Sequence, residues 1–153
     1  THSIYTTFKD VSVMFHVGTM LQFVANDPQS LDRKRHIGND IVVVIFKEFS
    51  GKKGDEVDLT SFVTQFNHVF VIVSPVTIKH VPMYQVTVAC RPSVRAFLPR
   101  FPEGTYFPRD ASFREWLLMK LINGERSALE SPQFIKSRKV ASKGNLEYVI
   151  ERC

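Results

Sequence analysis

The chain has little cysteine, no long hydrophobic run and no segment typical of a signal peptide. Among its 153 residues only Cys90 and Cys153 carry thiols, too few for a disulfide scaffold or a four-thiolate zinc site. The longest apolar run, Ile41–Phe46, falls far short of the ~20 residues that span a bilayer. No basic stretch followed by an apolar one indicates a secretory leader. We therefore expect no transmembrane segment and no disulfide-rich framework.

The motifs of common catalytic chemistries are also missing. The Gly- and Lys-containing stretch at residues 51–54 lacks the Ser or Thr of a phosphate-binding loop, and neither GxGxxG nor GxSxG occurs. The histidines are scattered without metal-ligand spacing (His2, His16, His36, His68 and His80). We therefore predict no metal site, no cofactor of the chain's own and no hydrolysis by a nucleophile of this chain.

The composition is that of a folded domain with a modest excess of positive charge. Hydrophobic residues make up 44% and charged residues 23%, so the chain can bury a core, and the formal net charge is +5. The charge is densest at Arg33-Lys34-Arg35-His36, between Asp32 and Asp40. A nucleic-acid-binding face usually needs a broader basic stripe with interleaved aromatics. We predict no nucleic-acid partner, and the cluster either complements the carbonyls at a helix end or faces a phosphate-bearing partner.

The first third of the sequence predicts a hairpin, a helix and a buried strand. Alternating apolar residues on both sides of Lys9-Asp10 favour a β-hairpin. Asp27 and Pro28 are typical of a helix start, and Gly38 of a helix end. The unbroken apolar run Ile41–Phe46 predicts a strand covered on both faces.

The rest of the chain predicts two further strands and a long helix. Apolar spacing favours a short helix over Leu59–Phe66, after a solvated loop. Asp110 is a suitable N-cap for the long helix, in which Asn123-Gly124 predicts either a turn or a weakened continuous helix. Pro132 ends or kinks it. The remaining predictions are strands at His68–Ser74 and Met83–Arg91, a connection at Pro75–Pro82, an irregular segment from Pro92 to Pro108, an inner helix face of Phe113, Trp116, Leu117 and Leu121, and a Lys- and Arg-containing tail from Phe134 to Cys153.

Together these elements predict an α/β fold with a mixed central sheet and flanking helices, as one domain over residues 1–153. Asn39 stands out within it, because a neutral amide lies between a helix-ending Gly and a buried strand. Asn in such a place is usually a cap or turn residue that tolerates unusual backbone angles. A carboxamide held rigidly on both sides could also be presented to a partner at little ordering cost. The residues alone leave both interpretations open.

Two segments resemble the GTPase-activating domain of the Rap GTPase-activating proteins, a family that includes the tuberin-like and Ral-directed members. The first is Lys34-Arg35-His36-Ile37-Gly38-Asn39-Asp40, which opens a hydrophobic strand as the family's hallmark string does. The second, residues 113–123, is similar to the closing helix of the Rap-directed branch, where Ala is more frequent at the position of Gly124. Members usually carry further sequence before the equivalent of Thr1, so we expect the domain to be N-terminally incomplete here.

The resemblance implies a mechanism in which an asparagine, the asparagine thumb, is supplied in trans to a small GTPase. Asn39 would be that catalytic residue and His36 would help to hold it, while Arg33, Lys34 and Arg35 would contact the partner or brace the helix. Rap lacks the glutamine with which its relatives orient the attacking water, and a carboxamide offers the same one acceptor and two donors. GTP and Mg²⁺ would be carried by the partner.

The resemblance also implies a fold similar to that of the small GTPases and a partner from the Ras superfamily: Rap, with Ral and Rheb as further candidates. It implies a cytoplasmic activator recruited to membranes where the GTPase is anchored, and it leaves room for a homodimer through regions outside this chain. The alternative function is a non-catalytic module that binds a GTPase or another partner with the same fold.

Overall fold

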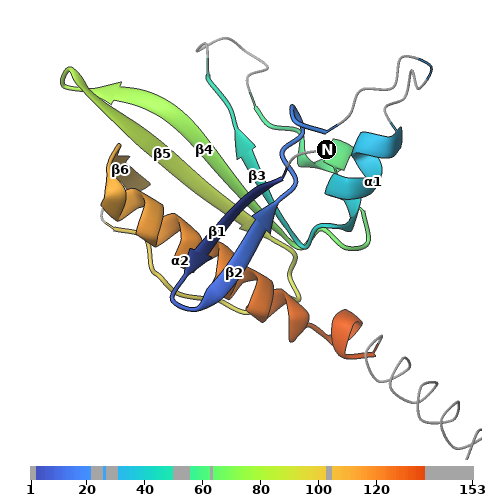
Figure 1. Cartoon of the computed structure of the whole chain (residues 1–153). Coiled ribbons are helices and arrows are strands. Elements are labelled where there is room, and N and C mark those ends of the chain that lie inside the picture. The colour runs from blue at the N-terminus through green and yellow to red at the C-terminus, as the bar shows by residue number, and fades with distance from the viewer. Residues whose placement is uncertain are drawn as a thin grey trace, which may run out of the picture.

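The structure, a computed structural model, describes residues 3–21, 26, 31–49, 56–62, 64–102 and 105–136. Within these ranges the chain forms a two-stranded hairpin, a four-stranded mixed sheet and the α-helices α1 and α2, and Figure 1 shows how they are arranged. The predicted α/β class with a mixed sheet and flanking helices is confirmed. None of the helices in the described ranges is both long enough and apolar enough to cross a membrane.

The predicted hairpin is present. Strands β1 (Ile4–Phe8) and β2 (Val11–Phe15) pair antiparallel. The two turn residues, Lys9 and Asp10, both have left-handed backbone angles, with φ of 46° and 62°. Positive φ at both central residues is typical of a type I′ turn, and the twist of this turn matches that of the flanking strands. The sequence lacks the usual Asn-Gly pair at this turn, and the hairpin forms without it.

The main sheet has the order β3-β4-β5-β6. Strand β3 (Val42–Phe46) runs parallel to β4 (Val69–Ile78), and β4 pairs antiparallel with β5 (Val81–Cys90). The short strand β6 (Tyr106–Pro108) completes it within the segment predicted to be irregular. The predicted helix over Leu59–Phe66 is instead one 3₁₀ turn, η1 (Leu59–Phe62).

The predicted connection over Pro75–Pro82 is wrong. Strand β4 continues through Pro75 to Ile78, and only Lys79 and His80 join it to β5, both with positive φ. Proline is excluded from central strands because it lacks an N–H. Strand β3 ends opposite Val73, however, so beyond that point β4 has a neighbouring strand on one side only and the missing donor costs little.

The prediction that the strand after the first helix is covered on both faces is also wrong. Strand β3 is an edge strand, and its side chains alternate in burial. Val43 is buried, whereas Val44 is 40% exposed and Phe46 is 61% exposed. The unbroken apolar run therefore forms a strand that has one partly open face. The sequence pattern alone does not distinguish such a strand from one that is covered on both faces.

The long helix begins as predicted. Helix α2 (Ala111–Leu129) follows the N-cap Asp110, whose side chain accepts hydrogen bonds from the backbone N–H groups of Ser112 at 2.8 Å and Phe113 at 3.3 Å. Gly124 lies inside the helix, so the continuous helix is confirmed and the turn is excluded. A Cβ at Gly124 would lie 3.2 Å from the Phe97 ring, which explains why a small residue fits there. After α2 the chain forms one more helical turn over residues 132–136, with Pro132 at its first position.

The core lies between α2 and the sheet. Val69 and Val71 of β4 are fully buried, and they pack with Phe113 and Leu121 of α2 and with Phe107 of β6. Full burial of a Val or Leu side chain stabilises a fold by about 1.5–3 kcal/mol, so this cluster accounts for much of the sheet's attachment to the helix. The predicted inner-face residues Trp116 and Leu117 are partly buried at its border.

Helix α2 also holds the irregular segment that precedes β6. Lys120 is buried, and its ammonium donates hydrogen bonds to the carbonyls of Phe97 and Pro99, each at 2.9 Å. Burial lowers the pKa of this ammonium. The indole N–H of Trp116 donates to the carbonyl of Arg100 at 3.0 Å. The loop carbonyls are thus paired with side chains, because this segment has no strand partner to pair them.

The cap of α2 generates a prediction about acid stability. The hydrogen bond from the Ser112 hydroxyl is the main cause that lowers the pKa of Asp110. A lowered folded-state pKa stabilises the fold at pH values above the unfolded-state pKa, and this contribution is lost as the pH falls through the folded-state pKa. Asp110→Asn keeps the acceptor but cannot take up that proton. We expect its urea midpoint to fall less than the wild-type midpoint between about pH 7 and about pH 3. Equal losses in both proteins would contradict this assignment.

Candidate functional site

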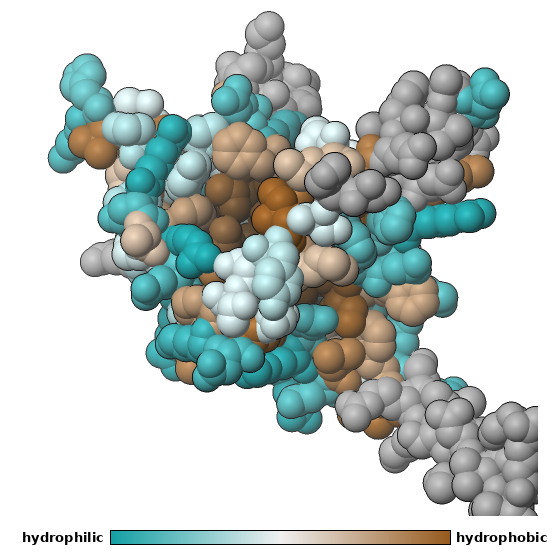
Figure 2. Space-filling model, viewed as in Figure 1, coloured by the Kyte–Doolittle hydropathy of each residue, from teal (hydrophilic) through white to brown (hydrophobic). Residues whose placement is uncertain are grey.

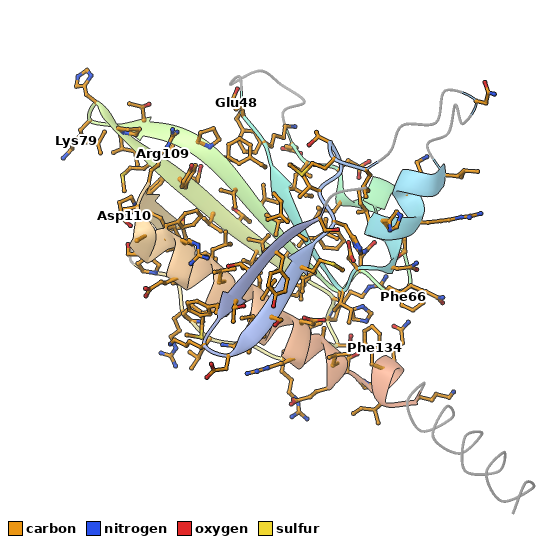
Figure 3. All side chains as sticks on the ribbon, viewed as in Figure 1. Glu48, Phe66, Lys79, Arg109, Asp110 and Phe134 are labelled. Atoms are coloured by element: carbon orange, nitrogen blue, oxygen red, sulfur yellow. The ribbon has the colours of Figure 1, made fainter. Side chains whose placement is uncertain are left out.

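The hallmark string lies on a short helix at the opposite end of the molecule from Lys79, Arg109 and Asp110, as Figures 1 and 3 show. Helix α1 (Leu31–Asn39) leads directly into β3. The predicted start at Asp27-Pro28 lies outside the described residues. The predicted end at Gly38 is wrong by one residue, because the helix includes Asn39.

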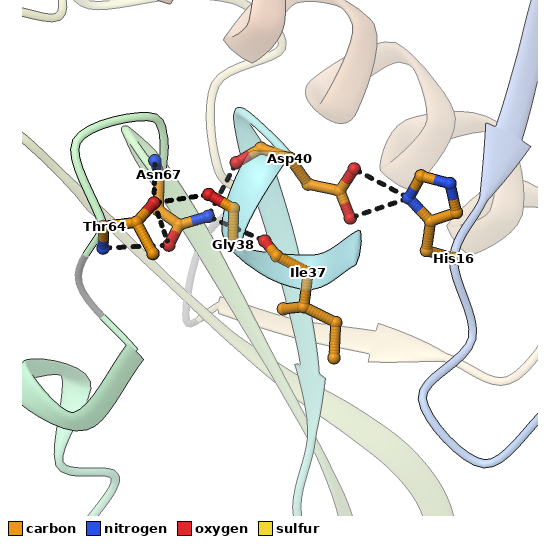
Figure 4. A network of polar contacts seen from close by, with 6 residues as sticks. All are labelled: His16, Ile37, Gly38, Asp40, Thr64 and Asn67. Carbon is orange, nitrogen blue, oxygen red and sulfur yellow. Dashed lines mark hydrogen bonds and ion pairs between the residues drawn. The ribbon is translucent and has the colours of Figure 1, made fainter. Parts of the chain in front are cut away.

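The carbonyls at the end of α1 accept hydrogen bonds from a buried side chain that lies in the segment before β4. Asn67 is fully buried and lies two residues before the start of β4. Its carboxamide nitrogen donates to the carbonyl of Ile37 at 3.0 Å and to that of Asp40 at 2.6 Å, as Figure 4 shows. The last carbonyls of a helix lack partners within the helix. Asn67 therefore acts as a C-terminal cap contributed by a distant part of the chain.

Thr64 completes this cap. The Thr64 hydroxyl oxygen lies 2.5 Å from the carbonyl oxygen of Gly38 and 3.0 Å from the side-chain oxygen of Asn67 (Figure 4). A Cβ on Gly38 would lie 3.2 Å from the Thr64 methyl group, so this close approach favours the glycine. We call Thr64 and Asn67 the α1 clamp.

The clamp is itself braced from the end of β5. The Arg91 guanidinium donates through Nε to the carbonyl of Asn67 at 2.8 Å, and through Nη2 to the carbonyl of Thr64. The backbone N–H groups of His68 and Val69 donate to the carbonyl of Ile41, which joins the start of β4 to the residue after α1. The end of α1 is therefore fixed to the most buried strand of the sheet.

The hairpin contacts the end of α1 from the other side. The two oxygens of the Asp40 carboxylate lie 2.9 Å and 3.1 Å from Nδ1 of His16 (Figure 4). A carboxylate can only accept, so Nδ1 carries the proton of this hydrogen bond. The ring of His36 lies 5.1 Å from that of His16, between ring centroids. This pair of contacts ties β2 to the last turn of α1.

Most of the predicted site residues lie on the exposed side of this arrangement. Asn39, His36, Lys34 and Arg35 are all exposed. The ring of His36 packs on that of His16, and the predicted support of Asn39 by His36 stays a prediction. The side chain of Arg33 lies outside the described part of the chain. Within the described ranges, no group of three metal-ligating side chains occurs.

A separate hydrophobic cavity of about 730 Å³ lies between the hairpin and β3. Consecutive residues of both β2 and β3 line it, and Leu121 and Ile122 of α2 lie at one side. Figure 2 shows hydrophobic side chains in a hollow at the centre of this face. Asp40 and His16 line its end, whereas neither Asn39 nor His36 does. The cavity is therefore distinct from the exposed surface around Asn39.

Sequence reasoning missed the clamp and the His16–Asp40 contact. A weak signal was available, because Asn67-His68 places two polar residues directly before a strongly apolar strand. A buried polar side chain must find partners. Nothing in the sequence indicated that those partners are the carbonyls of α1.

Comparison with known proteins agrees with the hallmark string. A sequence model described as Rap/ran-GAP matches residues 1–143. This chain belongs to the Rap/ran-GAP family. It is 43% identical over 152 residues to signal-induced proliferation-associated 1-like protein 1 of Mus musculus, covering 97% of this chain and 8% of that protein. It is also 37% identical over 156 residues to a GTPase-activating protein of Dictyostelium discoideum, covering 99% of this chain and 15% of that protein.

The fold is also similar to that of a solved structure. The structure titled "Structure of the TSC2 GAP domain" aligns with a TM-score of 0.61 and 26% identity, covering 83% of this chain and 64% of that chain. The Rap/ran-GAP chain described here spans a small part of the relatives it matches, between 8% of mouse signal-induced proliferation-associated 1-like protein 1 and 15% of the Dictyostelium protein. What these larger proteins do as wholes does not transfer directly to this segment.

Proposed function

We propose that this chain stimulates GTP hydrolysis by a Rap-type small GTPase, to which it supplies the carboxamide of Asn39 in trans. The observation that carries the proposal is the exposed Asn39 at the end of a helix whose neighbouring carbonyls are held by the side chains of Asn67 and Thr64. Membership of a GTPase-activating family supports it.

The chemistry asked of Asn39 is positioning. Phosphoryl transfer needs a water held in line with the breaking bond and stabilisation of the charge on the transferred group. A carboxamide has one acceptor and two donors, so it can orient that water and contact a phosphate oxygen. GTP and Mg²⁺ belong to the partner in this proposal, and the chain supplies no nucleophile.

The charges around Asn39 suit such a partner. Lys34 and Arg35 are exposed on the same short helix, and His36 lies in its last turn. Positive side chains at an interface raise the rate of encounter with a negatively charged partner. We assign Lys34 and Arg35 to encounter and Asn39 to the hydrolysis step.

Substitution of Asn39 tests the catalytic assignment. We expect Asn39→Ala to lower the stimulated rate of hydrolysis by about 10²–10³-fold, the range found when one preorganised polar group is removed from an active site. Asn39→Asp has the same shape but lacks the two donors, so we expect a comparable loss. Multiple-turnover hydrolysis of GTP-loaded Rap measures both, and melting curves check that the fold is kept. Near-wild-type stimulation by Asn39→Ala would leave the non-catalytic module as the better interpretation.

A panel of GTPases tests the partner. Because Rap lacks its own water-orienting glutamine, we expect wild-type chain to stimulate Rap more than Ral or Rheb under the same conditions. Hydrolysis by each GTP-loaded protein is measured with wild type and with Asn39→Ala. If the wild-type chain stimulates Ral or Rheb more than Rap, and Asn39→Ala removes that stimulation, then the partner is Ral or Rheb and the role of Asn39 stands.

Charge reversal tests the encounter role of α1. We expect Lys34→Glu to raise the GTPase concentration needed for half-maximal stimulation while the maximal rate changes little. The difference from wild type should shrink as salt screens the charges. Lys79→Glu, at the far tip of the β4–β5 hairpin (Figure 3), is the matched control and should have no effect. A lower maximal rate at unchanged half-maximal concentration would refute this division of roles.

A further inference from the structure

The backbone on both sides of Asn39 is held by hydrogen bonds. The carbonyl of Gly38, which belongs to the peptide unit before Asn39, accepts from the Thr64 hydroxyl at 2.5 Å. The N–H of Asp40, which belongs to the unit after it, donates to the carbonyl of Ile37 at 3.2 Å. Because each peptide unit is planar, these contacts restrain the two dihedral angles of Asn39.

Asn67 binds the two peptide units that lie one step further out on either side of Asn39. It donates to the carbonyl of Ile37, the acceptor of the Asp40 N–H, and to the carbonyl of Asp40 itself. It is fully buried and its own carbonyl is bound by Arg91. Its place is therefore set by the sheet and not by α1.

Helix α1 needs this support. It has nine residues, and helices shorter than about 12–15 residues are marginal in water by themselves. Asn39 is its last residue and is exposed, in the turn where helices fray. The α1 clamp therefore restrains the position at which fraying would otherwise displace the Asn39 side chain.

We infer that Thr64 and Asn67 are positioning residues for Asn39, an inference that rests on the proposed function. They need not touch the GTPase or its nucleotide. Their effect is to hold the Asn39 carboxamide in one place before the partner binds, so that the binding step does not have to order it. A displacement of about 1 Å in a catalytic group can cost on the order of 10²-fold in rate.

Thr64 offers the sharper test, because valine has the same shape without the hydroxyl. We expect Thr64→Val to lower the maximal rate of stimulated hydrolysis by about tenfold to a hundredfold. The half-maximal GTPase concentration should change little, since Lys34 and Arg35 remain. Thr64→Ser, which keeps the hydroxyl, should restore most of the rate. Thr77→Val, on the exposed part of β4, is the matched control and should behave as wild type.

A double-mutant comparison separates positioning from a general structural role. If Thr64 acts through Asn39, Thr64→Val should cause no further loss in a chain that already carries Asn39→Ala. An equal loss in both backgrounds would overturn the inference. Where Thr64→Val melts too low to assay, Thr64→Ala compared with Thr64→Ser asks the same question, because these two differ by the hydroxyl oxygen.

A measurement without a GTPase keeps this test independent of the proposed function. We expect the backbone order parameter of Asn39 to be near 0.85 in the wild-type chain and in Thr64→Ser, and to fall toward about 0.6 in Thr64→Val. An unchanged value in a folded Thr64→Val chain would overturn the inference. If instead Asn39→Ala retains full stimulation while the order parameter falls as expected, the proposed function fails and the clamp stands as a restraint on Asn39.

Discussion

The hydrogen bonds from Asn67 to the end of α1 are the contacts on which the arrangement of this site depends. One buried carboxamide donates to the carbonyls of Ile37 and Asp40, at the end of the helix where carbonyls run out of partners within the helix. Because Asn67 lies two residues before β4, the most buried strand, the stiffness of the core extends to the helix end. An exposed residue on a nine-residue helix can therefore occupy a defined position without contacts of its own.

The parts of the fold that follow local rules could be predicted from the sequence. The hairpin followed from alternation, and helix α2 followed from the Asp110 cap and its apolar face. Pro75 misled because its tolerance inside β4 depends on where the neighbouring β3 stops, which is a property of the sheet and not of the local sequence. The exposed face of β3 was missed for a similar reason, since an apolar run reports the hydrophobicity of a strand and not which of its faces is covered.

The candidate site, too, has a part that could be predicted from the sequence and a part that could not. The hallmark string around Asn39 could be found because its residues are contiguous. Its supports could not, because Asn67 lies 30 residues from Ile37 and His16 lies 24 from Asp40. A hydrogen bond between side chain and backbone at that separation leaves no periodic pattern in the sequence. His36 lies in the last turn of α1, where its ring packs on His16, and its predicted role in holding Asn39 stays a prediction.

The charges at the end of α1 complete the physical account. Asp40 is the acidic residue nearest to Asn39 in the sequence, and its carboxylate is bound to His16 of the hairpin. The exposed side of α1 carries Lys34 and Arg35. The Asp40 carboxylate is thus held toward the hairpin, and the helix that presents the neutral amide of Asn39 also carries these two cations. That combination suits a partner that carries phosphate, because the cations favour its approach while the amide, having no charge to neutralise, is free to orient a water molecule.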